Sequence, residues 1–189
     1  MTRKYPVITF LAAAIAILTR THLGKAGDQQ SHVHGQARIN VVVEKERATV
    51  EFLASAESMY GLEHPPRSTR EEQTRAAALA LLEKQIANMV IFDPSRTCRF
   101  SKNYLAVVTE DDQHFSEDHD REPRTHGGHS EVRAEFAVLC KTSLAGSQLR
   151  FEVTKIFPAL REVAVQIVSD TQQQGVTITD DVGSITLEK

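Results

Sequence analysis

The chain has 189 residues, with 22 Lys and Arg against 25 Asp and Glu, a formal net charge of −3 and eight histidines. This length is enough for one domain with its own hydrophobic core, so a second domain is not required. The basic residues do not cluster, which argues against nucleic acid and anionic membrane surfaces as partners.

The first 26 residues are predicted to be a secretory signal peptide. Arg3 and Lys4 precede an apolar run from Val7 to Leu18, and small residues follow at cleavage spacing. The run is shorter than the roughly 20 apolar residues of a transmembrane helix, so an uncleaved signal anchor is only the alternative. Cleavage would release residues 27–189 as a single periplasmic domain that is not an integral membrane protein. Because four basic and no acidic residues are removed, its net charge would fall from −3 to −7.

A β-hairpin is predicted next. Apolar residues alternate with polar ones from Gly35 to Val43 and again from Ala48 to Ala56, on either side of the polar turn Glu44–Arg47. Period-two alternation on both sides of a short turn is typical of two paired strands with one buried face. The adjacent prolines between Gly61 and Arg67 then exclude regular structure from that connection.

One long helix is predicted after this connection. Ser68 and Thr69 each stand three residues before a glutamate, Glu71 and Glu72, which is a doubled capping-box pattern. The segment Phe92-Asp93-Pro94 is expected to end the helical run. The apolar stripe expected to face the core is Leu79, Leu82, Ile86 and Met89.

The rest of the chain reads mostly as strands. Apolar or alternating runs predict them over Cys98–Val108, Val132–Cys140, Leu149–Val153, Val163–Ile167, Val176–Thr179 and Ser184–Leu187. With so few helices to make crossovers, the sheet must be mainly antiparallel. The predicted fold class is α+β: a mainly antiparallel domain of about seven or eight strands with one long helix.

The two cysteines, Cys98 and Cys140, lie at the outer ends of two predicted strands. In an oxidising compartment they can pair as a disulfide, whereas two free buried thiols are the alternative. The bridge would close 41 intervening residues. On the loop-entropy model it would stabilise the fold by about 4 kcal/mol.

Between these two strands lies a polar segment, 109–130, which holds half of the histidines. It is rich in Asp and Glu, and imidazole and carboxylate donors together suit a borderline divalent cation such as Zn²⁺. The alternative is an ordinary solvated acidic loop. The candidate metal ligands in this segment are His114, His119, His126 and His129.

A second candidate site precedes the hairpin. In an extended conformation His32 and His34 point to the same face, about two strand rises of ~3.3 Å apart, and can chelate one ion. The alternative is an exposed, idle pair at a frayed N-terminus. Glu63 and His64 could add a carboxylate and an imidazole, although a turn residue bonded to backbone is the simpler interpretation. Because zinc sites need three or four converging donors, the separate segments matter only in combination.

Catalytic signatures are missing from the sequence. It contains no H-E-x-x-H helix, no G-x-S-x-G elbow and no Gly-rich phosphate loop. A metal-binding protein that is not an enzyme is therefore favoured over a zinc-dependent hydrolase. Cu²⁺ and Ni²⁺ also bind imidazole, so the metal stays open on these grounds.

Several motifs follow one another in an order that chance seldom produces. They are His32-x-His34-Gly35-x-Ala37-x-Ile39-Asn40-Val41, Gly61–Arg67 ahead of the helix, Cys98, the His/acidic loop, His129-Ser130-Glu131 leading to Phe136 and Cys140, and Phe157-Pro158 followed by Val163-Ala164-Val165-Gln166. In these motifs the chain resembles the ZrgA-like family of periplasmic zinc-binding proteins associated with zinc uptake. The resemblance spans nearly all of the mature chain.

The resemblance implies Zn²⁺ as the bound ion, a histidine loop that collects or buffers it, and a membrane metal transporter as partner. By position it implies His32, His34 and His64 as ligands of a better-ordered site. In this chain Arg121, Pro123 and Arg124 dilute the His/acidic tract, which lowers the expected capacity of the loop. The competing hypotheses are an exported β-rich interaction domain with incidental histidines, and a copper- or nickel-binding protein of the same compartment.

Overall fold

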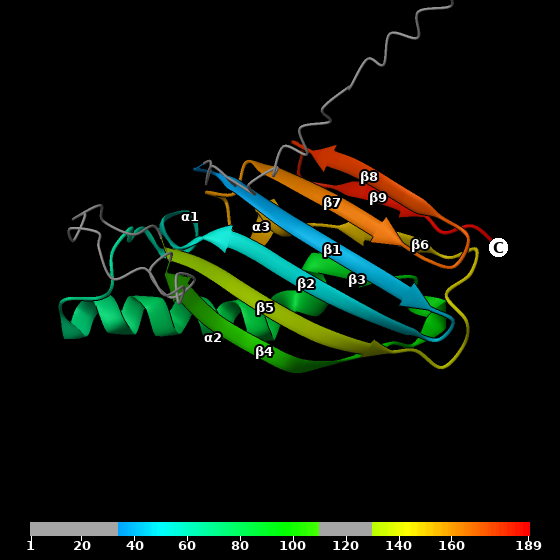
Figure 1. Ribbon diagram of the computed structural model, residues 1–189, viewed down its shortest axis with the longest axis horizontal. Coiled ribbons are helices and arrows are strands. Elements are labelled where there is room, and N and C mark those ends of the chain that lie inside the picture. Colours follow the sequence, from blue (N-terminus) through cyan, green and yellow to red (C-terminus); the bar gives the residue numbers. More distant parts are fainter. Residues whose placement is uncertain (1–33, 110–129) are drawn as a thin grey trace, which may run out of the picture. The chain divides into compact units, whose positions relative to one another are not determined.

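Two β-sheets and one long helix make up residues 34–109 and 130–189, the part of the chain that the computed structural model describes (Figure 1). The elements are β1 (Gln36–Glu44), β2 (Arg47–Ser55), α1 (Ala56–Tyr60), α2 (Thr69–Met89), β3 (Val90–Phe92), the 3-10 turn η1 (Pro94–Arg96), β4 (Arg99–Thr109), β5 (Ser130–Leu139), β6 (Gln148–Phe151), α3 (Val153–Ile156), β7 (Glu162–Val168), β8 (Gln173–Ile178) and β9 (Gly183–Thr186). All described residues fall into one compact unit. The predicted signal peptide, residues 1–26, lies outside them.

The larger sheet has six strands in the order β4-β5-β2-β1-β7-β8. The predicted hairpin is confirmed: β1 pairs antiparallel with β2 from Ala37↔Ala54 to Glu44↔Arg47. On its other side β1 pairs parallel with β7, from Gln36↔Glu162 to Val42↔Val168. All other described pairings are antiparallel, as the α+β prediction required.

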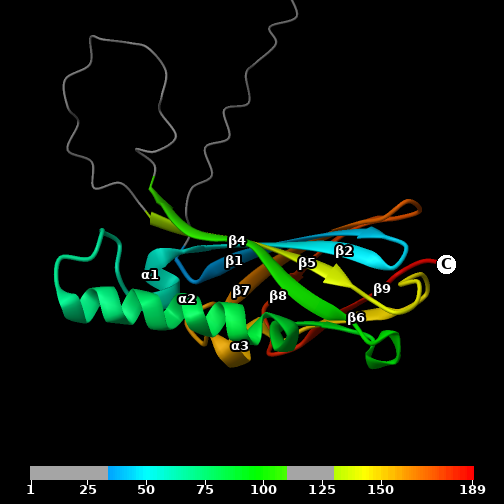
Figure 2. The same cartoon turned by 90° about the horizontal axis from the view of Figure 1, so that it is seen from below.

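The core lies between the six-stranded sheet and a second layer. This layer contains α2 and the three-stranded sheet β3-β6-β9, which Figure 2 shows on the same side of the larger sheet. Alternate residues of β1, β2, β5 and β7 point into it because successive strand residues face opposite sides. Burying each large side chain stabilises the fold by about 1.5–3 kcal/mol. Among the largest fully buried side chains are Ile39, Phe52, Leu82, Met89, Phe136 and Phe151.

Helix α2 begins where the capping pattern predicted. The Ser68 hydroxyl accepts a hydrogen bond from the Glu71 N–H (3.3 Å), while the Glu71 carboxylate accepts one from the Arg67 N–H (2.7 Å). The helix buries Ala78, Leu82, Ile86 and Met89 and only partly buries Leu79. It does not run on to Phe92: Val90–Phe92 forms β3 and pairs with β6, burying Val90 and Phe92 on one face.

Two short helices replace the ends of predicted strands. Ala56 begins α1 and Val153 begins α3, although the period-two alternation runs through both positions. Both side chains are buried, at 0% and 2% exposure, so the first helical residue continues the apolar pattern of the preceding strand. None of the described helices is both long and apolar enough to cross a lipid bilayer.

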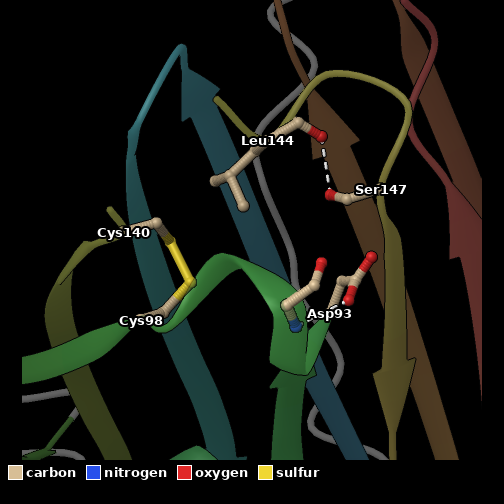
Figure 3. The surroundings of a disulfide bond; sticks show 6 residues. Asp93, Cys98, Cys140, Leu144 and Ser147 are labelled. Carbon is tan, nitrogen blue, oxygen red and sulfur yellow. Dashed lines mark hydrogen bonds between the residues drawn. A yellow bond between two sulfur atoms is a disulfide. The ribbon is translucent and has the colours of Figure 1, made fainter. Parts of the chain in front are cut away.

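The predicted disulfide between Cys98 and Cys140 is confirmed (Figure 3). It lies at the end of the β4–β5 pair where Arg99 is opposite Leu139, and thus far from the opposite end, where Thr109 pairs with Ser130. The Cys140 N–H donates to the Glu46 carbonyl (2.9 Å). The bridged end is thereby also tied to the turn between β1 and β2.

Close to the bridge, the Ser147 hydroxyl donates to the carbonyl of Leu144 (2.6 Å), the interaction drawn as a dashed line in Figure 3. The N–H of Leu144 in turn donates to the carbonyl of Lys45 (2.8 Å). This loop therefore covers the bridged end of the sheet with satisfied backbone groups.

We expect loss of the disulfide to destabilise the fold without removing a metal ligand. The double variant Cys98→Ala/Cys140→Ala should lose about 2–4 kcal/mol of unfolding free energy, because its unfolded chain regains loop-closure entropy. Urea denaturation followed by circular dichroism measures this, with the reduced wild-type protein as control. An unchanged denaturation midpoint would show that the bridge is not what holds this end together.

Candidate metal centre

Two of the seven histidines predicted to bind metal lie in the described part of the chain. They are His34, directly before β1, and His64, in the connection between α1 and α2. The other five lie outside the described residues: His32, His114, His119, His126 and His129.

One end of the six-stranded sheet gathers the segments that sequence analysis singled out. There β1 begins, β2 ends and leads into α1, β4 ends and β5 begins (Figure 1). The register places Ser55 opposite Glu131 and Thr109 opposite Ser130. His34 and both strand ends that flank the predicted histidine loop therefore belong to the same end of the sheet, and the disulfide belongs to the other.

The backbone beside His34 is anchored on two sides. The N–H of Gly35 donates to the hydroxyl of Ser58 in α1 (2.8 Å). Its carbonyl accepts from the N–H groups of Arg161 (2.7 Å) and Glu162 (3.1 Å) at the start of β7. His34 thus precedes a fixed point of the fold rather than a frayed end.

The His34 ring lies between two carboxylates. Its Nδ1 is 2.8 Å from Oε2 of Glu57, on α1, and its Nε2 is 3.6 Å from Oε1 of Glu63, in the connection that follows. The three side chains are 57%, 39% and 56% exposed, so water and dissolved ions can reach them. An imidazole flanked by carboxylates is a donor combination that zinc accepts.

These carboxylates raise the pKa of His34 above its ordinary value. The hydrogen bond to Glu57 contributes most, followed by the negative charge of Glu57; partial desolvation opposes them, and the charge of Glu63 adds a smaller increase. All three favourable contributions stabilise positive charge at the ring. The same field would attract a divalent cation.

His64 makes the backbone contact that was the simpler interpretation of its position. Its Nδ1 lies 2.9 Å from the carbonyl oxygen of Pro65, and the side chain is exposed. Within residues 34–109 and 130–189, no group of three or more His, Cys, Asp or Glu side chains is arranged to hold a metal ion. His34 and the two glutamates are thus a partial donor set.

Glu57 is the residue that sequence analysis missed, whereas Glu63 was considered beside His64. Glu57 lies 23 residues from His34, so no local spacing connects them. A usable signal is Ser55, whose side chain caps α1 by accepting from the Ser58 N–H (3.2 Å). This cap starts a helix that turns Glu57 away from the pattern of β2.

Comparison with known proteins identifies the family. Comparison with curated proteins gave no match. The sequence model of the ZrgA family zinc uptake protein matches residues 31–187, which includes every element of the described fold. This description names zinc uptake and not an enzymatic reaction. The chain therefore belongs to the ZrgA family of zinc uptake proteins.

Proposed function

We propose that this protein is an exported, periplasmic zinc-binding protein that collects or buffers Zn²⁺ for a membrane zinc-uptake system. The observation that carries the proposal is the position of His34. It lies between two carboxylates, at the sheet end where the strands flanking the histidine segment also end and begin. Donors from separate segments of the chain can converge there on one ion.

The ordered site in this proposal uses His34 with its neighbour His32, and draws on His64 from the connection before α2. The segment between β4 and β5 supplies further, weaker donors: His114, His119, His126 and His129. The partial donor set of the described residues supports this division, because zinc needs three or four ligands and His34 alone supplies one imidazole. Binding without catalysis is proposed because the family is defined by zinc uptake.

Export is supported by two independent features. The disulfide between Cys98 and Cys140 suits an oxidising compartment. The first 26 residues have the charge and apolar pattern of a secretory signal peptide. A transporter in the membrane that borders that compartment is the proposed recipient of the zinc.

Equilibrium dialysis against zinc tests the proposal directly, on protein purified without a histidine tag. Stoichiometric binding at micromolar zinc supports it, and no binding would favour an interaction domain with incidental histidines. Metal analysis of the same material separates zinc from copper and nickel, because Cu²⁺ binds imidazole sites more tightly than Zn²⁺ does.

We expect the His32→Ala/His34→Ala variant to lose the tighter phase of zinc binding and to keep the weaker one. Two imidazoles are up to half of the ligands of a four-coordinate zinc ion. Isothermal titration calorimetry resolves the two phases, and the matched control is His22→Ala, outside the proposed site. Unaltered tight binding in the double variant would mean that the N-terminal histidines are idle.

Removing residues 112–125 should lower the zinc stoichiometry while leaving the fold intact. The excision deletes His114 and His119, but closure entropy changes by only about 0.6 kcal/mol for each halving of loop length. Thermal denaturation in metal-free buffer and equilibrium dialysis give the two readouts. If the excised protein unfolds without metal, the segment belongs to the core and is not a metal-collecting loop.

Zinc affinity should weaken as the pH falls, beginning above the ordinary histidine pKa of about 6.5. Protons compete with zinc for imidazole, and the two glutamates raise the pKa of His34, so the competition starts at a higher pH than for an isolated histidine. Titrations across about pH 7.5 to 5.5 measure the effect. Constant affinity over that range would rule out histidine ligation.

A further inference from the structure

The two nitrogens of the His34 ring have different surroundings. Nδ1 is at hydrogen-bonding distance from Glu57 Oε2, at 2.8 Å, whereas Nε2 is 3.6 Å from Glu63 Oε1, beyond a normal hydrogen bond. A carboxylate oxygen can only accept, so Nδ1 must carry the proton of this bond. In the neutral ring Nε2 then holds the free lone pair, which is the form that binds a metal ion.

Glu57 is itself held in place by a chain of hydroxyl groups. The hydroxyl of Ser55 donates to that of Ser58 (2.7 Å), and the hydroxyl of Ser58 donates to Glu57 Oε2 (3.5 Å). Ser58 is 5% exposed and also accepts from the Gly35 N–H, so it joins the carboxylate to the backbone beside His34. Glu57 therefore has a buried support, and its oxygen is already used by Nδ1.

The separation of Nε2 and the Glu63 carboxylate fits two ligands of one ion. Ligands of tetrahedral zinc lie about 2.0–2.2 Å from the metal, which puts two of them about 3.3–3.5 Å apart. The observed 3.6 Å needs only a small adjustment, and Glu63 stands in an irregular connection that can supply it.

We propose that Glu57 is a positioning residue that acts through His34, holding the ring so that Nε2 and the carboxylate of Glu63 form a two-donor arm for Zn²⁺. A carboxylate that accepts from the far nitrogen of a ligating histidine fixes its tautomer and orientation and makes the ring a stronger donor. The inference rests on the proposed zinc-binding function and assigns roles to two glutamates within it.

Four single variants test this assignment, each purified without a histidine tag and titrated with zinc. Glu57→Ala removes the acceptor and should weaken the tighter phase by about 10- to 100-fold. Glu57→Gln keeps an accepting oxygen but not the charge, so its loss should be smaller. Glu63→Gln removes a proposed ligand and should also weaken that phase. Glu44→Gln removes the same charge at the far end of β1 and should leave binding unchanged.

A second readout separates positioning from a general structural effect. In metal-free protein, nitrogen chemical shifts of the His34 ring should report the Nδ1–H tautomer, and Glu57→Ala should lose that preference while the melting temperature stays close to the wild-type value. In a His34→Ala background, Glu57→Ala should cause no further loss of zinc affinity, because Glu57 acts only through the ring.

The outcomes distinguish this inference from the function on which it rests. If the wild-type protein does not bind zinc, the proposed function fails. If it binds zinc and both Glu57→Ala and Glu63→Gln bind equally well, the function stands and the roles assigned to the glutamates are overturned. They are also overturned if Glu57→Ala lowers affinity as much in the His34→Ala background as in the wild type.

Discussion

The position of His34 depends on the hydrogen bonds of the next residue, Gly35. Its N–H is bound by Ser58 in α1 and its carbonyl by the first residues of the β7 region, so one peptide segment joins two separate parts of the fold. Gly35 has a φ of +78°, which glycine adopts without strain, and an added Cβ would lie 3.3 Å from the carbonyl oxygen of Ala159. The exposed ring of His34 is held beside Glu57 because its backbone is fixed in this way.

Local patterns predicted the elements whose cause is local. The hairpin of β1 and β2 follows from period-two alternation, and α2 starts at Ser68 because the serine and Glu71 satisfy N–H groups at the helix start. The disulfide followed from the inferred compartment and from the position of both cysteines at strand ends. In each case the residues that decide the structure are neighbours in sequence or share one simple constraint.

The features that escaped prediction depend on contacts between distant segments. The parallel pairing of β1 with β7 joins residues 126 positions apart, as in the bond between Gln36 and Glu162. The last apolar residues before Pro94 form β3 because β6 offers them a partner, which no helical pattern reveals. The role of Glu57 arises only when α1 folds back beside His34, so spacing could suggest the histidines but not the carboxylate that orients one of them.

The two ends of the large sheet divide the structural and the proposed functional tasks. The disulfide stabilises the end where β4 begins and β5 ends, while continuous pairing carries the same two strands to the opposite end, where Thr109 meets Ser130. Because those strand ends are already held together, the segment between them adds little closure entropy whatever its length. Its histidine content can therefore change without cost to the fold, whereas the geometry around His34 cannot. The number of ions held and the strength of the tightest site are thus set by different residues, and selection can adjust one without disturbing the other.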